Sequence, residues 1–331
     1  MLKILIFFIC LSALAAEKDL LRISDNEIIL GVKANLGGRV MLFRRHDGQN
    51  VINSNPKHWG LTDKQIPAAN CKSKFVEYNG HIVWVGPYSK WWSDPEPKLT
   101  PPDSGFYPDQ YLIYDRCKVL EHSAKKLVLL GNQSPLNGMQ MQKSFEIIGG
   151  GKVKLTVKVT NRRKRPVTWN IWSNTRFNPE GQFGFPVAWN KNLLFSFSAW
   201  RPYKERALSF DIDKGICAFN RPDPKLVKKY SYYGKLSYKK YCPIYAVLGN
   251  NLFIKQVSGT PKGSVPSEHA PVEVYQRFTS DSRGNIMELE FHSPLFTLQP
   301  GESYTFAETW TLKKLAPEIA EKALSDIVKS K

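Results

Sequence analysis

Short runs in which apolar and polar residues alternate, separated by turn residues about every eight to fifteen positions, dominate this sequence. They include "KVKLTVKVT" (152–160), "NEIILGVKA" (26–34) and "LFIKQV" (252–257). Successive side chains of a β-strand point to opposite faces, so each run offers one face to a core. Only "APEIAEKALSDIVKS" (316–330) has apolar residues at helical spacing. The sequence therefore predicts an all-β protein with a short C-terminal helix.

A charged segment, "NRRKRP" (161–166), separates two of the alternating runs. The runs are "KVKLTVKVT" before it and "VTWNIWSNT" (167–175) after it. We predict an antiparallel hairpin closed by this segment, with its four basic side chains in water.

The first residues have the composition of a cleavable secretory signal. Lys3 precedes an apolar run, and small residues lie at Ala13, Ala15 and Ala16. The run is too short for a stable membrane anchor, so we expect no stable membrane insertion. We predict a signal peptide at 1–16, a single domain at 17–331, and an exported protein that is periplasmic or secreted.

Loss of residues 1–16 would remove Lys3 and no acidic residue, leaving 46 basic and 29 acidic residues and a net charge of +17. Such a charge favours anionic partners, and it equally suits a surface that stays soluble by self-repulsion. Four cysteines would remain: Cys71, Cys117, Cys217 and Cys242. They allow three disulfide pairings, with buried free thiols as the alternative.

Tryptophans cluster beside a proline-rich segment, "WWSDPEPKLTPPDSGFYPDQ" (91–110), for which we predict a long ordered loop. Aromatic rings offer flat apolar surfaces on which the C–H faces of a sugar can stack. Because Trp91 and Trp92 are consecutive, they cannot both point inward on an extended chain. We expect them, with Trp84, to contact sugar, although core packing is the alternative for each tryptophan.

Motifs of other chemistries are absent from the sequence. It contains no phosphate-binding Walker loop, dinucleotide-binding glycine pattern, zinc-protease helix motif or nucleophile elbow. Asp94, Glu96, Asp103 and Asp109 lack the spacing of a calcium loop, so capping of turns is the simpler use. A basic, tyrosine-rich stretch (228–241) could stack on single-stranded nucleic acid, which export disfavours. We predict no cofactor, no metal site and no nucleic-acid partner.

The segment "IMELEFH" (286–292) places carboxylates and an imidazole on one face of a strand. Its apolar residues Met287, Leu289 and Phe291 point to the opposite face from its polar residues. Alternation alone predicts that the apolar set is buried and that Glu288, Glu290 and His292 are not.

Several segments together resemble galactose-mutarotase-like proteins, most closely an exported bacterial group within them. They are "LGGRVMLFRRHDGQNVIN" (36–53), "NGHIVWVGP" (79–87), "VKVTNRRKRPVTWNIWSNTRFNPEG" (157–181), "VEVY" (272–275) and "MELEFHSPLFTLQPGESYTFAETWTL" (287–312). The resemblance covers nearly the whole chain after residue 16, and the last segment is its most specific part. It implies a β-supersandwich of large antiparallel sheets with an open sugar cleft on the concave side.

In aldose epimerases of this fold, a glutamate acts as general base on the anomeric hydroxyl and a histidine as general acid on the ring oxygen. The resemblance implies that Glu290 is the base, and repulsion from Glu288 could raise its pKa. The acid histidine belongs where this sequence has Asn174, whose amide cannot deliver a proton. His81 is the candidate substitute.

Three functions follow in order of preference. The first is an exported protein that binds or processes carbohydrate, with acidic or sulfated glycans favoured by Arg176 and Lys255. The second is an active aldose 1-epimerase, and the third is a non-catalytic envelope interaction protein. The sequence indicates no particular oligomeric state. The predicted catalytic residues are Glu290 and His81, and the predicted substrate-binding residues are Trp84, Trp91, Trp92, Trp172, Asn174, Arg176, Lys255, Glu273 and Glu288.

Overall fold

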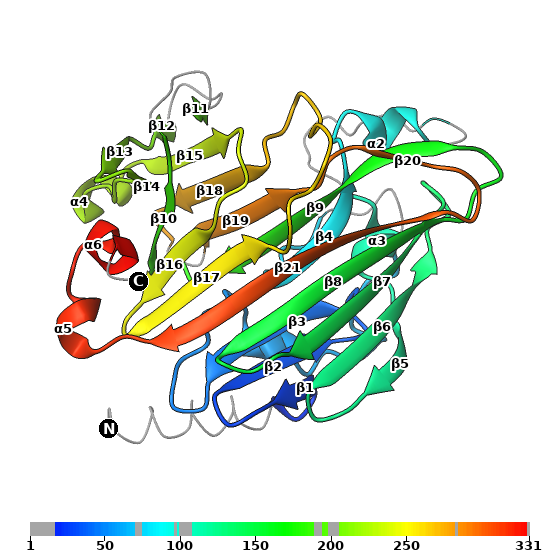
Figure 1. Ribbon diagram of the computed structural model, residues 1–331, viewed down its shortest axis with the longest axis horizontal. Helices are drawn as coiled ribbons and strands as arrows, with labels where there is room; N and C mark the ends of the chain where they lie inside the picture. The colour runs from blue at the N-terminus through cyan, green and yellow to red at the C-terminus, as the bar shows by residue number, and fades with distance from the viewer. Residues whose placement is uncertain are drawn as a thin grey trace.

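The computed structural model describes residues 17–69, 75–95, 98, 108–188, 194–197, 205–281 and 284–329. Two large β-sheets make up most of this part of the chain, and its helices are few and short (Figure 1). All but one of the strand pairs are antiparallel, the exception being β12 beside β15. The structure confirms the predicted all-β class. The signal peptide predicted at 1–16, and most of the loop predicted at 91–110, lie outside the described residues.

One sheet holds the long central strands that later carry the site. Within the described residues it has 11 strands in the order β1-β2-β3-β4-β9-β19-β18-β15-β11, with β12 beside β15 and β20 beside β9. Its strands are β1 (Leu21–Ser24), β2 (Ile28–Lys33), β3 (Arg39–Arg45), β4 (His81–Gly86), β9 (Val167–Phe177), β11 (Leu194–Phe197), β12 (Glu205–Ala207), β15 (Ser231–Tyr238), β18 (Val272–Phe278), β19 (Ile286–His292) and β20 (Phe296–Leu298).

The other sheet has 10 strands in the described part of the chain, in the order β13-β14-β10-β16-β17-β21-β8-β7-β6-β5. Its strands are β5 (Lys118–His122), β6 (Lys126–Gln133), β7 (Met139–Ile147), β8 (Lys152–Asn161), β10 (Gln182–Pro186), β13 (Phe210–Asp213), β14 (Ile216–Phe219), β16 (Ile244–Leu248), β17 (Asn251–Val257) and β21 (Ser303–Lys314).

Aromatic side chains from both sheets meet between them. Phe43 of β3 contacts Phe253 of β17 and Trp310 of β21, with ring centroids 6.0 and 5.9 Å apart. All three side chains are fully buried. Burial of side chains of this size contributes roughly 1.5–3 kcal/mol each, so this core holds the two sheets face to face.

The predicted hairpin around "NRRKRP" is wrong. β8 pairs with β7 and β21 in one sheet, whereas β9 pairs with β4, β19 and β20 in the other. The charged segment therefore passes between sheets. Its side chains do not all stay in water: Arg163 Nη1 lies 2.6 Å from the carboxylate of Asp94, and both side chains are only 14% exposed. A crossing between layers brings this arginine against the end of a neighbouring helix.

The helices of the described residues are short, as Figure 1 shows. They are the 3-10 helix η1 (Pro56–His58) and the α-helices α2 (Lys90–Ser93), α3 (Gln110–Ile113), α4 (Pro224–Val227), α5 (Pro317–Ala320) and α6 (Leu324–Lys329). None is long and apolar enough to cross a membrane.

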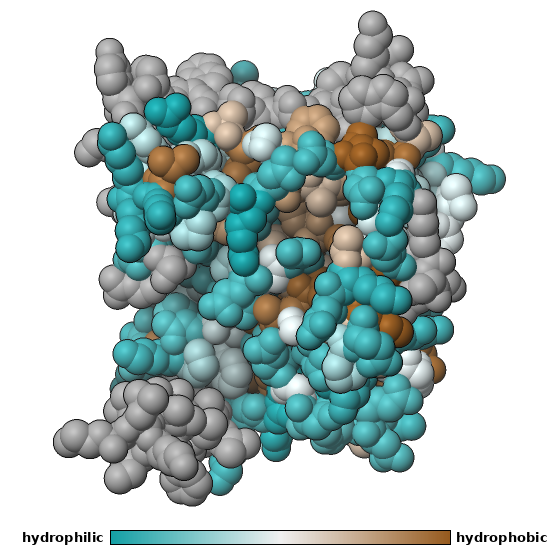
Figure 2. All heavy atoms as spheres, turned by 90° about the vertical axis from the view of Figure 1, so that its left-hand side faces the viewer, coloured by the Kyte–Doolittle hydropathy of each residue, from teal (hydrophilic) through white to brown (hydrophobic). Residues whose placement is uncertain are grey.

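The predicted C-terminal helix is interrupted. α5 and α6 are separated by residues 321–323, although the apolar stripe packs on the sheet as expected. Ile327 is buried against Leu252 and Leu315, and Ile319 packs on the same cluster. The turn between the helices lets both isoleucines reach this cluster. The end of the molecule near α4 and α6 shows apolar side chains in a hollow between polar ones (Figure 2).

Three described cysteines, Cys117, Cys217 and Cys242, carry free thiols. This agrees with the alternative to disulfide pairing for these three residues. Cys71 lies outside the described residues.

Candidate functional site

Four neighbouring strands of the 11-stranded sheet place polar side chains on one of its faces. Residues directly opposite each other in an antiparallel pair point to the same side. Glu290 of β19 lies opposite Asn174 of β9 and opposite Glu273 of β18, which in turn lies opposite Ser237 of β15. These four side chains therefore share the face that points away from the other sheet, which we call the outer face.

A pocket of about 360 Å³ opens on the outer face. Its size falls in the range of small-molecule sites, roughly 300–1,000 Å³. Aromatic rings and charged or amide groups alternate around it. The lining residues are Phe75, Glu77, Trp84, Trp172, Asn174, Arg176, Lys235, Tyr275, Arg277, Ile286, Glu288 and Glu290.

A lysine that sequence reasoning missed joins two carboxylates in the floor of this pocket. Lys235 Nζ lies 2.5 Å from Glu273 Oε2 and 3.0 Å from Glu290 Oε2. The amide of Asn174 donates to Glu290 Oε1 at 2.7 Å. Both carboxylates are almost completely buried. The Lys235 ammonium thus faces two buried carboxylates, and it lies closer to Glu273 than to Glu290.

The pKa values of the two carboxylates move apart as a result. Burial, opposed by Lys235 and aided by Glu288 and Glu273, raises the pKa of Glu290 to about 7. Burial also acts to raise the pKa of Glu273, but Lys235 and His292 hold it well below its ordinary value. The predicted repulsion from Glu288 is thus present, although burial is the larger cause.

Glu273 is also fixed by groups outside the pocket. Its Oε1 accepts hydrogen bonds from Ser237 Oγ at 3.1 Å and from the backbone N–H of Ala270 at 3.2 Å. Its Oε2 lies 3.0 Å from Nε2 of His292. Burial lowers the pKa of His292 to about 3, so this imidazole is neutral. These partners hold Glu273 in place, and it is not among the residues that line the pocket.

The expectation that the polar face of "IMELEFH" is not buried is wrong for two of its three residues. Glu290 is 1% exposed and His292 is 0% exposed. The Glu288 side chain is 14% exposed and accepts from Arg176 Nε at 2.9 Å. Side chains from neighbouring strands and loops cover this face, whereas the opposite face is covered by the other sheet.

His81 does not join Glu290. It lies opposite Thr175 of β9, which lies opposite Leu289, so it shares the inner face with these residues. Its Nδ1 is 2.9 Å from Thr175 Oγ1, and its ring meets Trp310 edge-on at 4.7 Å. Burial, with nearby cations, holds its pKa well below the ordinary value. A neutral imidazole between the sheets cannot donate a proton in a pocket on the other face.

Lys255 also lies between the sheets rather than in the pocket. It is 0% exposed, and its ammonium donates to the backbone carbonyls of Ser173 and Leu289 at 3.1 and 2.8 Å. Its charge is balanced by Glu308, 3.6 Å away. The structure therefore gives Lys255 a role in holding β9 and β19 to the opposite sheet.

Trp91 and Trp92 both point inward, contrary to expectation. They are 6% and 9% exposed, because residues 90–93 form the helix α2 instead of an extended segment. Trp91 donates to the carbonyl of Val85 at 2.7 Å and stacks against Trp172 with centroids 6.0 Å apart. Only Trp84 and Trp172 of the predicted tryptophans line the pocket.

The acids near the proline-rich segment have structural partners. Asp94 binds Arg163, and Asp109 accepts from the backbone N–H of Tyr111 at the start of α3. Glu96 and Asp103 lie outside the described residues. Asp109 thus follows the capping alternative, whereas the Asp94 side chain is held in an ion pair.

Sequence reasoning missed several pocket residues besides Lys235, namely Phe75, Glu77, Tyr275, Arg277 and Ile286. Lys235 belongs to the stretch 228–241, for which stacking on nucleic acid was the functional alternative. It reaches the pocket because β15 pairs with β18, which puts it opposite Tyr275. Local spacing carries no signal for a pairing between segments so far apart in the chain.

Comparison with known proteins places these observations in context. The model of the family described as "Domain of unknown function (DUF4380)" matches residues 19–313. A search of curated proteins returned no match.

Solved structures share the fold. A galactose mutarotase-like protein from Lactobacillus casei has a TM-score of 0.56 and 11% identity, over 89% of this chain and 100% of that chain. One from Clostridium acetobutylicum has a TM-score of 0.52 and 12% identity, over 89% and 95%. A GalM/aldose epimerase homologue from C. elegans has a TM-score of 0.50 and 10% identity, over 90% and 99%. This chain therefore has the galactose-mutarotase-like fold, as the sequence resemblance implied.

Proposed function

The chain belongs to the family of the DUF4380 domain of unknown function, and from that premise we propose that it binds a neutral carbohydrate in the pocket on the outer face of its 11-stranded sheet. The observation that carries the proposal is the pocket lining, in which aromatic rings stand beside polar groups whose charges are already paired. The fold shared with galactose mutarotase-like proteins also supports a carbohydrate ligand.

The aromatic and polar groups of the lining match the two kinds of surface on a sugar. Phe75 and Tyr275 are partly exposed, whereas Trp84 and Trp172 are buried, and all four line the pocket. Such rings favour the C–H faces of a pyranose. Carboxylate and amide groups at Glu290 and at its neighbours offer acceptors and donors to hydroxyl groups.

Charge pairing in the pocket favours a neutral ligand. Arg176 is bound to Glu288, and Arg277 lies 3.4 Å from a carboxylate oxygen of Glu77. Lys235 is shared by Glu273 and Glu290. An acidic or sulfated group would have to displace one of these carboxylates. The preference for anionic glycans predicted from Arg176 and Lys255 therefore loses its support, since Lys255 also lies on the other side of the sheet.

Binding is proposed ahead of aldose 1-epimerisation because Asn174, His81 and Lys235 do not suit the role of general acid. Glu290 faces the pocket and could act as a base, but Asn174 cannot donate a proton to a ring oxygen. His81 points to the opposite face. Lys235 holds its proton firmly: although burial opposes it, the two carboxylates raise the pKa of this ammonium.

Export belongs to the proposal as well. Its support is the signal-like composition of residues 1–16, and a carbohydrate ligand suits an exported protein. Detection of the processed chain outside the cytoplasm, with the first residue of the mature protein identified by N-terminal sequencing, tests it.

The test of binding is calorimetric titration with a panel of neutral monosaccharides and disaccharides and their uronic or sulfated counterparts. We expect saturable binding of at least one neutral sugar. At pH 8, where Glu290 is mostly ionised, Glu290→Gln should weaken it at least about tenfold, because hydrogen bonds to a charged group are worth about 1.5–3 kcal/mol. Glu146→Gln is the matched control, since Glu146 is exposed on β7 of the other sheet.

Three results would overturn the proposal. One is equal affinity of the wild type and Glu290→Gln, and another is binding of anionic glycans only. The third is acceleration by the wild type, but not by Glu290→Gln, of the equilibration of a freshly dissolved α-sugar followed by polarimetry, which would establish the epimerase instead. A fourth outcome would favour a non-catalytic envelope interaction protein. In that case the protein binds no sugar but binds acidic polymers in a salt-sensitive manner, and Glu290→Gln leaves this binding unchanged.

A further inference from the structure

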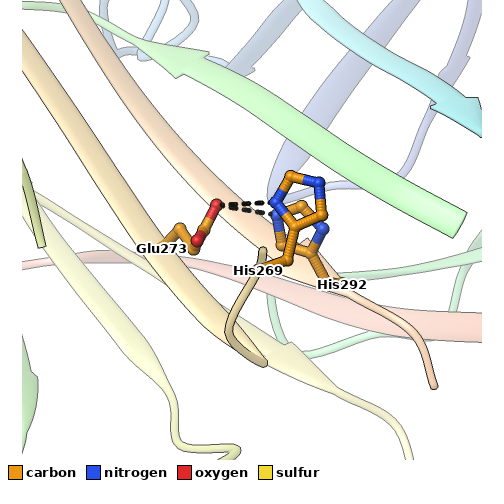
Figure 3. Close-up of side chains that lie close together, drawn as sticks. All are labelled: His269, Glu273 and His292. Carbon is orange, nitrogen blue, oxygen red and sulfur yellow. Dashed lines mark hydrogen bonds and ion pairs between the residues drawn. The ribbon is translucent and has the colours of Figure 1, made fainter. Parts of the chain in front are cut away.

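Two imidazoles and one carboxylate converge beside the pocket. Glu273 is the second residue of β18, His292 is the last residue of the adjacent β19, and His269 lies in the loop before β18. Both rings direct a nitrogen toward the same oxygen of Glu273 (Figure 3). The three side chains are at most 5% exposed.

The spacing of these atoms fits a coordination sphere. Glu273 Oε2 lies 3.0 Å from His292 Nε2 and 3.4 Å from His269 Nδ1, and the three atoms all lie within 4.8 Å of one another. Metal–ligand bonds of about 2.0–2.2 Å place neighbouring ligand atoms roughly 3.0–3.5 Å apart. We propose that His269, Glu273 and His292 bind a divalent first-row transition metal ion, for which two imidazoles and a carboxylate are a suitable donor set.

The groups behind the two imidazoles suit this role. A metal-binding histidine commonly donates its other N–H to an acceptor. Glu268 Oε1 lies 3.6 Å from His269 Nε2. Behind His292, Nδ1 is 3.4 Å from Nδ2 of Asn170, while Asn170 Oδ1 has no hydrogen-bond partner among the described residues. Rotation of the Asn170 amide would turn its Oδ1 toward the Nδ1–H of His292. That His292 tautomer leaves Nε2 free to bind a metal. The rotation would break the 3.3 Å hydrogen bond from Asn170 Nδ2 to the Ile171 carbonyl.

Lys235 competes with the metal. Its ammonium lies 2.5 Å from the same Glu273 oxygen, and it also reaches Glu290 at 3.0 Å. It can therefore remain paired with Glu290 when a metal takes Glu273. The two imidazoles stack at 4.1 Å with 19° between their planes, so they must also tilt toward a shared ion. Removal of the ammonium should consequently strengthen metal binding.

The experiment is titration of the full chain with Zn²⁺, followed by calorimetry, with Co²⁺ absorption as a report on the ligand set. We expect one site with a dissociation constant below about 10 µM. Glu273→Gln and His292→Ala should each weaken it at least about tenfold. Lys235→Met should tighten it about tenfold or more, because a like charge beside the site is removed. His122→Ala, which changes an exposed histidine, is the control.

The Lys235→Met result keeps the test decisive even if the other variants unfold, provided that circular dichroism shows this variant to be folded, because an unfolded chain would bind Zn²⁺ through its exposed cysteines and histidines. Equal or weaker Zn²⁺ binding by Lys235→Met, or wild-type binding by folded Glu273→Gln and His292→Ala, would overturn the proposal. So would the absence of any site in the wild type. The proposed metal site differs from the prediction, made from the sequence, that there is no metal site. It does not depend on the proposed sugar binding, because sugar binding is measured in a separate titration.

Discussion

Lys255→Met is the substitution whose consequence follows most directly from the structure. The lysine is 0% exposed, and its ammonium donates to the carbonyls of Ser173 and Leu289 at 3.1 and 2.8 Å. Glu308, also buried, lies 3.6 Å from it and accepts from Trp310 Nε1 at 3.0 Å. Methionine has a similar length but no charge, so Glu308 loses its cation and keeps only the Trp310 donor, and the two carbonyls lose the ammonium.

The expected loss of unfolding free energy is about 3–5 kcal/mol, the usual cost of removing one partner of a buried ion pair. Glu308→Gln should cost less, about 1–2 kcal/mol, because Lys255 keeps its two carbonyl acceptors. The double variant leaves no uncompensated charge. Its loss of unfolding free energy should therefore be about 2 kcal/mol smaller than the sum of the losses in the two single variants.

Urea unfolding followed by tryptophan fluorescence and far-ultraviolet circular dichroism measures these losses. Lys158→Met, at an exposed position on β8, is the control and should stay within about 0.5 kcal/mol of the wild type. A Lys255→Met protein within about 1 kcal/mol of the wild type would refute the reasoning, as would additive losses in the double variant.

Two further predictions concern a buried acid and a crowded glycine. Burial raises the pKa of Asp109 to about 6. Because this value exceeds the pKa of the unfolded state, about 4, the protein should lose about 3 kcal/mol of unfolding free energy as the pH rises from about 4 to about 6. Asp109→Asn should remove most of this loss in urea unfolding at pH 4 and pH 7, and an unchanged pH profile would contradict it. Gly37 has φ of +65° and a Cβ there would collide with the last carbonyl of α3, so Gly37→Ala should cost more than about 3 kcal/mol. Gly149→Ala, with φ of +79° but open space around it, should cost only about 1–2 kcal/mol, and equal losses would contradict the steric argument.

Alternation along a strand predicts which side chains share a face, but not what covers that face. For 286–292 the two sets of residues do point to opposite sides, and Glu290 does face a pocket. Burial of Glu290 and His292 could not be predicted, because it depends on β15, β18 and a loop that meet them only in the folded chain. The same limit explains Lys235, which is one lysine among many in a basic stretch until β15 pairs with β18.

Local geometry was the other source of error. Trp91 and Trp92 would point to opposite faces of an extended chain, but the single helical turn of α2 buries both. The predicted hairpin assumed that two consecutive strands pair, whereas the chain moves to the other sheet after β8. Neither outcome can be read from alternation, since both strands keep their period of two in either arrangement.

The two faces of the central strands are connected through the backbone. Lys255 holds the carbonyls of Ser173 and Leu289 on the inner face, and the next residues, Asn174 and Glu290, meet through a 2.7 Å hydrogen bond on the outer face. Loss of the lysine should therefore let these strands shift and disturb the pocket. We expect folded Lys255→Met, measured by calorimetry well below its unfolding transition, to bind the neutral sugar about threefold to tenfold more weakly, since small displacements of a site cost about 0.6–1.4 kcal/mol. Wild-type affinity in that variant would mean that the buried ion pair stabilises the sheets without positioning the pocket.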